Sequence, residues 1–231
     1  MTQRVLEIRS PRYIPPGALD TGRNIDDFFP KEQPLALEIG CGIGDFILQR
    51  AQQQPRVNFL AIDIYNKGCL KTCRRIDEAE LDNVRVMRIE ARQLFSDHLA
   101  PQSLTAIYIN CPDPWPKKRH RSRRLVSPTF LDLVAPYLQP QGELFFATDF
   151  TDYAEQVAEF VPDLKSFTNC CATPIVTDLT NYPVSKYMRR FLDLGQPIYY
   201  AHLRRRDNLP LTESAEVPQG FRARWGAAIN D

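Results

Sequence analysis

The chain has few histidines and no C-x-x-C motif, and both shortages limit the chemistry open to it. Only three histidines occur among its 231 residues, and none of its six cysteines forms a C-x-x-C pair. Because zinc sites depend on such pairs or on clusters of histidine and cysteine, we expect no metal centre. Cysteines without pairing motifs are typically buried, reduced thiols, which favours a cytoplasmic location.

Long apolar runs and an excess of charge are also missing. No run approaches the length of a transmembrane helix, and residues 1–12 contain no apolar stretch typical of a secretory signal. We therefore expect a cytoplasmic protein without a membrane association. Since 29 basic residues against 28 acidic ones leave a net charge of +1, affinity for a polyanion must come from a local cluster of cations.

Short apolar segments alternate with segments of helical length through most of the chain. The predicted strands are 35–39, 58–64, 84–89, 104–109, 143–148 and 198–203, and the predicted helices are 45–54, 67–81, 127–138, 152–160 and 185–194. This alternation is typical of a doubly wound, mostly parallel α/β sheet with helices on both faces. We expect an irregular N-terminal arm (1–34), one domain (35–203) and a polar, mobile C-terminal tail (204–231).

A glycine-rich turn, G-C-G-I-G at residues 40–44, follows the first predicted strand. Gly40 and Gly42 allow the backbone to approach a ligand closely at the edge where parallel strands end. Acidic residues stand at three neighbouring strand ends, namely Glu38, Asp63 and Glu90. Because these ends meet at one edge of the sheet, we expect the three carboxylates to lie in one crevice.

An acidic crevice favours S-adenosylmethionine over a dinucleotide, whose pyrophosphate the carboxylates would repel. S-adenosylmethionine has no phosphate, and it carries an ammonium, a sulfonium and a ribose diol. Asp63 would accept from the ribose hydroxyls, Glu90 would face the adenine edge, and Glu38 would lie near the amino-acid end. Two alternatives stay open: the acids cap turns, or the chain is a nicotinamide oxidoreductase with an incomplete G-x-G-x-x-G motif.

The segment 109–124 reads I-N-C-P-D-P-W-P-K-K-R-H-R-S-R-R. Its three prolines restrict φ and exclude helix and sheet pairing, so the loop should be stiff. It combines a carboxylate (Asp113), an aromatic face (Trp115) and a basic run, which suggests a flat, anionic ligand such as a nucleic acid. Trp115 could stack on a base or pack beneath the loop. The cations expected to contact phosphates are Lys117, Lys118, Arg119, Arg121, Arg123 and Arg124.

These segments together resemble the bacterial tRNA (guanine-N7)-methyltransferase family. The resemblance rests on L-E-I-G-C-G-I-G, A-I-D-I-Y, C-P-D-P-W-P-K-K-R-H, A-T-D-F and the run 185–190, and it extends over residues 35–203. It implies a Rossmann-like class I methyltransferase fold and S-adenosylmethionine as methyl donor. It also implies a guanosine of the tRNA variable loop as acceptor, 7-methylguanosine as product, and a monomer or homodimer.

The resemblance also implies roles for single residues. Cofactor contacts fall on Glu38, Asp63, Glu90 and Asp113, and substrate contacts fall on Lys117, Asp149 and the segment Ser185, Lys186, Tyr187 and Met188. The family usually has Thr and Glu at the two ends of that last segment, and an aromatic residue where Cys111 stands. Because Met188 lacks a carboxylate, two alternatives stay open. One is a related methyltransferase with another RNA or small-molecule acceptor, and the other is an RNA-binding homologue without catalysis.

Guanine N7 has an in-plane lone pair, so methylation there needs no general base and depends mainly on alignment. The product ring gains positive charge, which a nearby carboxylate stabilises. Asp113 and Asp149 are the candidates, with Asp113 at the reacting end. A carboxylate can also accept from N1–H and the exocyclic amine, which selects guanine over adenine.

Overall fold

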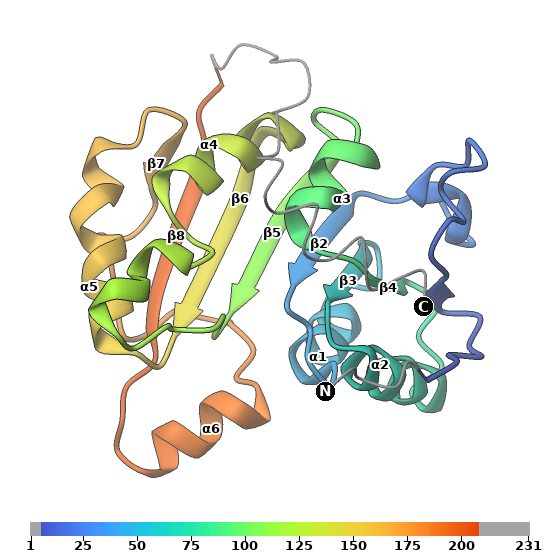
Figure 1. The fold of residues 1–231 in the computed structure, drawn as a ribbon, viewed down its shortest axis with the longest axis horizontal. Helices are drawn as coiled ribbons and strands as arrows, with labels where there is room; N and C mark the ends of the chain where they lie inside the picture. The colour runs from blue at the N-terminus through green and yellow to red at the C-terminus, as the bar shows by residue number, and fades with distance from the viewer. Residues whose placement is uncertain (1–5, 208–231) are drawn as a thin grey trace.

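One mostly parallel sheet of eight strands organises the chain, in a computed structural model that describes residues 6–207 (Figure 1). The strand order is β1-β4-β3-β2-β5-β6-β8-β7. The strands are β1 (Tyr13–Ile14), β2 (Leu35–Ile39), β3 (Asn58–Asp63), β4 (Val84–Arg88), β5 (Leu104–Asn110), β6 (Leu138–Thr148), β7 (Phe167–Asn169) and β8 (Tyr199–Arg205). Strands β1 to β6 pair in parallel, and β8 runs antiparallel to β6 and β7. The predicted doubly wound, mostly parallel fold is confirmed.

The central strands are buried on both faces, as expected of a parallel sheet covered on both sides. In β2, Leu35, Leu37 and Ile39 join one apolar cluster, whereas Ala36 joins a second cluster on the opposite face. The α-helices that accompany the sheet are α1 (Asp45–Gln53), α2 (Asn66–Glu78), α3 (Ala91–Asp97), α4 (Pro128–Val134), α5 (Thr151–Phe160) and α6 (Lys186–Asp193). Short 3₁₀ helices are η1 (Ile25–Phe28), η2 (Lys118–Arg123), η3 (Ala135–Tyr137) and η4 (Val161–Asp163).

The N-terminal arm departs from the irregular segment that the sequence predicts. Strand β1 pairs in parallel with β4 at Val86 and Met87 and so extends the sheet. Leu6 also exchanges two hydrogen bonds with the Asn66 side chain, at 2.7 and 3.1 Å. The arm is therefore part of the domain. At the other end β8 continues to Arg205, beyond the predicted end at residue 203, and residues 208–231 of the predicted tail lie outside the described residues.

The carboxyl ends of β5 and β6 point toward α6, which lies beyond that edge of the sheet at the bottom of Figure 1. Helix α1 begins at the same edge, directly after the glycine turn that follows β2. Although 141 residues separate Asp45 from Lys186, the backbone N–H of Lys186 donates to the Asp45 carboxylate. The sheet thus places the glycine turn opposite the segment 185–190.

Candidate active site

The glycine turn leaves open space beside its backbone. Gly40 and Gly42 have φ values of +80° and +55°, in the left-handed region that favours glycine. A Cβ atom placed at either residue would meet no atom within 4 Å. By contrast, a Cβ at Gly44 would stand 2.7 Å from the Thr72 side chain. Gly44 is therefore required for packing, whereas Gly40 and Gly42 border room for a ligand.

Two of the three predicted acids hold local backbone. Asp63 accepts the N–H groups of Gly42 and Tyr65, each at 2.8 Å. Glu90 caps α3, where it accepts the N–H of Arg92 at 2.8 Å and pairs with the Arg92 guanidinium at 3.1 Å. Burial raises the pKa of Glu90. The interpretation that acids cap turns is thus correct for these two residues, and their remaining lone pairs are available to a ligand, since a carboxylate has about four acceptor sites.

Glu38 is different, because no cap or turn explains it. It lies within β2 with 2% of its surface exposed. Its Oε1 accepts from Asn110 Nδ2 at 3.3 Å, and its Oε2 has no hydrogen-bond partner among the described residues. Burial raises the pKa of Glu38 to about 8. A carboxyl oxygen that is buried beside a cavity and has no partner among the described residues is available to a ligand.

Two cavities adjoin the glycine turn and share Gly40. The smaller, of about 220 Å³, is lined by Asp63, Glu90 and Asp113 together with apolar groups that include Ile64 and Ile89. The larger, of about 990 Å³, is lined by Glu38, Gly42 and Asn110 on the sheet side. The structure therefore brings all the predicted cofactor residues to one turn: Glu38, Gly40, Gly42, Asp63, Glu90 and Asp113.

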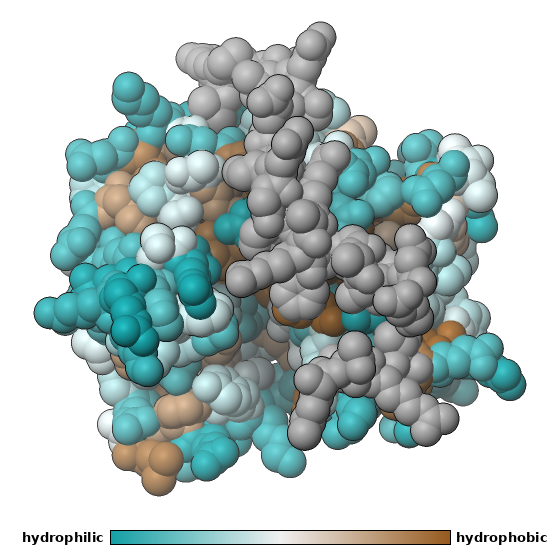
Figure 2. All heavy atoms as spheres, viewed as in Figure 1, coloured by the Kyte–Doolittle hydropathy of each residue, from teal (hydrophilic) through white to brown (hydrophobic). Residues whose placement is uncertain are grey.

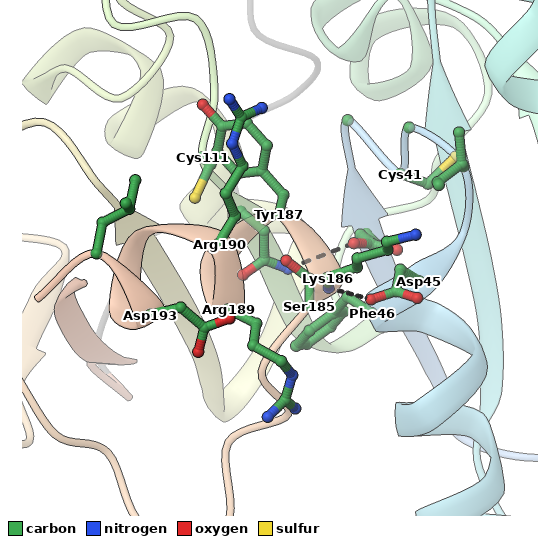
Figure 3. A pocket seen from close by; sticks show the side chains of 16 residues that line it. Cys41, Asp45, Phe46, Cys111, Ser185, Lys186, Tyr187, Arg189, Arg190 and Asp193 are labelled. Carbon is green, nitrogen blue, oxygen red and sulfur yellow. Dashed lines mark hydrogen bonds between the residues drawn. The ribbon is translucent and has the colours of Figure 1, made fainter. Parts of the chain in front are cut away.

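The far wall of the larger cavity is built by α6 and the residue before it (Figure 3). Ser185 caps α6 by accepting the Met188 N–H at 3.2 Å. Lys186 and Tyr187 follow on the first turn and line the cavity. The Tyr187 hydroxyl donates to Asp149 Oδ2 at 3.5 Å, which brings the acid of A-T-D-F to this wall. Ser185, Lys186, Tyr187 and Asp149 therefore gather opposite the predicted cofactor residues.

The proline-rich loop leaves β5 with two residues in the left-handed region, Cys111 at φ 45° and Trp115 at φ 44°. Strained backbone of this kind is concentrated at functional sites. Trp115 is half-buried; the Arg123 guanidinium lies 5.0 Å from its ring, and His120 meets its edge. One side of Trp115 is therefore already occupied by the chain's own arginine.

The basic run divides into exposed and structural cations. Lys117, Lys118, Arg119 and Arg123 are exposed, and Figure 2 shows a strongly hydrophilic area at the left of the molecule, around the segment that carries η2. Arg124 is 1% exposed; it donates to Pro114 O at 2.8 Å and pairs with Asp152 at 2.5 Å. The prediction that Arg124 contacts phosphate is corrected, because its guanidinium is buried against α5. Arg121 also pairs with Asp152, and it stays partly exposed.

Comparisons with known proteins agree with this geometry. The family model "Putative methyltransferase" matches residues 32–201. A tRNA (guanine-N(7)-)-methyltransferase of Syntrophotalea carbinolica is 51% identical, with 98% of this chain and 99% of that protein covered. A protein of the same name from Geobacter metallireducens is 48% identical over 88% of this chain and 97% of its own length. This chain belongs to the tRNA (guanine-N7)-methyltransferase family.

A solved structure supports the fold of this methyltransferase independently. The 30S ribosomal A1408 methyltransferase from an uncultured bacterium superposes with a TM-score of 0.55 at 13% identity, covering 82% of this chain and 93% of that one. At this identity the likeness establishes the class I methyltransferase fold. Within the described residues no helix is long and apolar enough to cross a membrane, and no group of His, Cys, Asp or Glu is arranged to hold a metal.

Met188 does not occupy the position that the sequence predicted for it in the methyltransferase. Its side chain has 0% exposure and belongs to the apolar cluster that also contains Phe46 and Tyr182. The prediction of a substrate contact is wrong for this residue, because the side chain anchors α6 to the core. A signal was present in the sequence, since Met188 and Phe191 are spaced i, i+3 on a helix whose other residues are largely polar.

Two further residues of the methyltransferase site escaped the sequence analysis. Asn110, the last residue of β5, donates to Glu38. Tyr182, on the segment before α6, donates to Asn110 Oδ1 at 2.6 Å. The residues of this second pair are 72 positions apart in the chain, so no local pattern could have joined them.

Proposed function

We propose that this methyltransferase transfers the methyl group of S-adenosylmethionine to N7 of a guanosine in the variable loop of tRNA, forming 7-methylguanosine. The observation that carries the proposal is the buried, unpartnered carboxylate oxygen of Glu38 at the glycine turn. The two relatives, matched over nearly their full length, are named for the same reaction.

The residues at the turn fit S-adenosylmethionine. Its ammonium would neutralise Glu38, where a phosphate would be repelled. The open space at Gly40 and Gly42 would admit the amino-acid part, Asp63 would accept from the ribose diol, and Glu90 would face the adenine edge. The donor, when bound, supplies a methyl group activated by the adjacent sulfonium.

The chain's own contribution to the reaction is alignment and charge. Because N7 carries its own lone pair, the protein needs to hold the guanine in line with the methyl group and does not need a general base. Asp113 is exposed at the smaller cavity, where its carboxylate would stabilise the positive charge that develops on the ring. Asp149, which is hydrogen-bonded to Tyr187, would accept from the guanine N1–H and amine.

The polynucleotide part of the substrate would lie along the exposed cations after the proline-rich loop. Lys117, Lys118, Arg119 and Arg123 offer four charges without a carboxylate salt bridge among the described residues. Each phosphate contact contributes a salt-dependent increment of affinity. Trp115 is available to stack on a base only from the side not covered by Arg123. A cytoplasmic location and a monomeric or homodimeric state complete the proposal.

The donor is tested by calorimetric titration with S-adenosylmethionine. We expect binding to the wild type, its near abolition by Asp63→Ala, and normal binding to Asp163→Ala, which removes an exposed acid that lines neither cavity. Absence of heat with well-folded wild-type protein would refute the donor assignment.

The acceptor is tested by incubating unmodified tRNA with methyl-labelled donor and analysing the nucleosides by mass spectrometry. We expect label in 7-methylguanosine, lost when the variable-loop guanosine is replaced by adenosine. Label on adenine or cytosine, or on no nucleoside, would refute this part of the proposal. The alternatives based on Met188 lose their basis, since a buried side chain in the core does not select a substrate.

A further inference from the structure

Two consecutive hydrogen bonds connect Tyr182, in the segment before α6, with the buried Glu38. The Tyr182 hydroxyl donates to Asn110 Oδ1 at 2.6 Å, and Asn110 Nδ2 donates to Glu38 Oε1 at 3.3 Å. Tyr182 itself is 8% exposed, and its ring packs against Phe46 at 5.1 Å and Tyr200 at 5.4 Å. The hydroxyl is thus held in an apolar cluster with its oxygen at the Asn110 amide.

The chemistry of the phenol, the amide and the carboxyl group decides which atom donates in each of the two hydrogen bonds. Burial raises the pKa of Tyr182 well above its ordinary value of 10.0, so the phenol keeps its proton and can donate. An amide that accepts on its oxygen presents its N–H₂ to the next group. With Tyr182 donating to the oxygen, the Asn110 N–H₂ faces Glu38 and favours the carboxylate form. With the amide reversed, its oxygen would face Glu38 and favour the protonated form.

We infer that Tyr182 is a positioning residue of the methyl-donor site, which acts by fixing the orientation of the Asn110 amide so that Glu38 is held as an acceptor for a cation. The inference rests on the proposed donor and extends it to two residues outside the family motifs quoted above. Neither Tyr182 nor Asn110 takes part in the methyl transfer under this proposal.

The segment that carries Tyr182 is itself fastened to the donor side of the cavity. Arg50 donates to Asn181 O at 3.4 Å, and Gln49 donates to Val184 O at 3.3 Å. Both side chains project from α1, the helix that begins at the glycine turn. The backbone on both sides of Tyr182 is therefore held against α1, which fixes the phenol in its place beside Asn110.

The other titratable groups near Glu38 disfavour its ionised form. Asp63 and Asp45 both raise the pKa of Glu38 through charge repulsion, whereas the hydrogen bond from Asn110 lowers it. The thiol of Cys41 and the phenol of Tyr182 also face Glu38 and are neutral, since burial raises the pKa of each. Of the causes that act on Glu38, the hydrogen bond from Asn110 is therefore the one that lowers its pKa and favours the ionised form.

The test uses the full-length protein without donor, labelled with ¹³C at the glutamate carboxyl carbons. Glu38 is assigned by the loss of its signal in Glu38→Gln, and its titration is followed by NMR. Tyr182→Phe removes only the hydroxyl. The titration midpoint of Glu38 should then move to a higher pH, by about 0.5 to 1 on the pH scale, because the hydrogen bond from Asn110 to the carboxylate is weakened. Tyr200→Phe is the matched control, since its ring lies in the same cluster and its hydroxyl has no hydrogen bond to the described residues.

Two more measurements separate positioning from general damage. Asn110→Ala should raise the midpoint as well, and adding Tyr182→Phe to it should have no further effect, as expected when one residue acts through the other. At pH 7 the affinity for S-adenosylmethionine should fall about three- to tenfold in Tyr182→Phe, in line with the smaller ionised fraction, while KM for tRNA stays unchanged.

Equal Glu38 midpoints in Tyr182→Phe, Tyr200→Phe and wild type would overturn the inference, as would additive effects in the double variant. These outcomes are distinct from failure of the proposed function. In that case wild-type protein would bind no donor or methylate no tRNA, whereas the donor-free titration would still report whether Tyr182 acts on Glu38.

Discussion

Replacing Glu38 with glutamine should stabilise the donor-free protein and remove its affinity for the methyl donor. The two side chains have nearly the same shape, so the substitution changes charge with little change in packing. Glu38 is 2% exposed, and one of its carboxylate oxygens has no partner within residues 6–207. The wild-type protein therefore buries a group whose ionised form is poorly solvated, and glutamine relieves that cost.

The magnitude follows from the pKa. Burial raises the pKa of Glu38 from 4.5 to about 8, so the folded state binds this proton more tightly than the unfolded state. The corresponding loss of stability is absent below pH 4.5, grows as pH rises from 4.5 to 8, and is complete above 8. At about 1.4 kcal/mol for each pH unit, the full effect is about 5 kcal/mol. This is comparable to the total stability of many domains, about 5–15 kcal/mol.

The assay is urea unfolding of both proteins at pH 5.0 and pH 8.5. The advantage of Glu38→Gln over wild type should increase by about 4 kcal/mol between the two pH values, because most of the titration range lies between them. Glu159→Gln, at an exposed site on α5, serves as control and should show no such increase. An advantage that is the same at both pH values would contradict the assignment of Glu38 as a group that is buried largely protonated.

Donor binding supplies the second half of this prediction. Saturating S-adenosylmethionine should raise the Tm of the wild type, because a bound ammonium compensates the buried carboxylate. Glu38→Gln should show little shift, with an affinity lower by tenfold or more, since truncating one partner of a buried charge pair costs about 2–5 kcal/mol. Equal donor affinity in the two proteins would show that Glu38 is not the ammonium-binding group.

Three further substitutions test the assignments on the acceptor side. Arg124→Ala should lower the free energy of unfolding by about 1–3 kcal/mol, since it leaves the Pro114 carbonyl without its donor and removes one of the two arginines that pair with Asp152. Urea unfolding measures this loss beside Arg119→Ala, which should lose almost nothing. Met188→Glu should destabilise the protein by about 2–5 kcal/mol because it buries an unpaired acid, and a gain in tRNA methylation would contradict the buried position. Lys118→Ala should weaken tRNA binding and reduce the slope of log affinity against log salt by about 1, as measured by filter binding at several salt concentrations; an unchanged slope would exclude a phosphate contact.

Much of the fold could be predicted from the sequence because apolar runs, glycine turns and helix caps are formed by residues that are close together in the chain. The strand Leu35–Ile39 is predicted with its observed bounds, since the short length of the apolar run and the glycine turn after it favour a buried strand over a helix. Helix α3 was missed, although Glu90 caps it, because only seven residues follow before the helix ends. Strand β7, of three residues, is also too short to leave a periodic signal.

The site was predicted less completely, because two of its features depend on distant contacts. In the basic run Arg123 and Arg124 are adjacent and chemically alike, yet one is exposed and the other buried. Asp152, 28 residues further along the chain, decides the difference by pairing with Arg124. The link from Tyr182 through Asn110 to Glu38 likewise joins three separate elements, and it emerges only when the strands are ordered in the sheet.

The acids at the glycine turn show how structural and functional roles can be separated. Asp63 and Glu90 satisfy backbone N–H groups and would be useful to the fold even without a ligand. In the part of the chain that the structure describes, Glu38 accepts from no backbone N–H group, and one of its oxygens has no partner. A fold under selection for stability alone would place an apolar residue or an amide there, since either removes the cost of burial. We therefore propose that a cation binds beside Glu38, and of the three acids it is the one whose presence argues most directly for the donor.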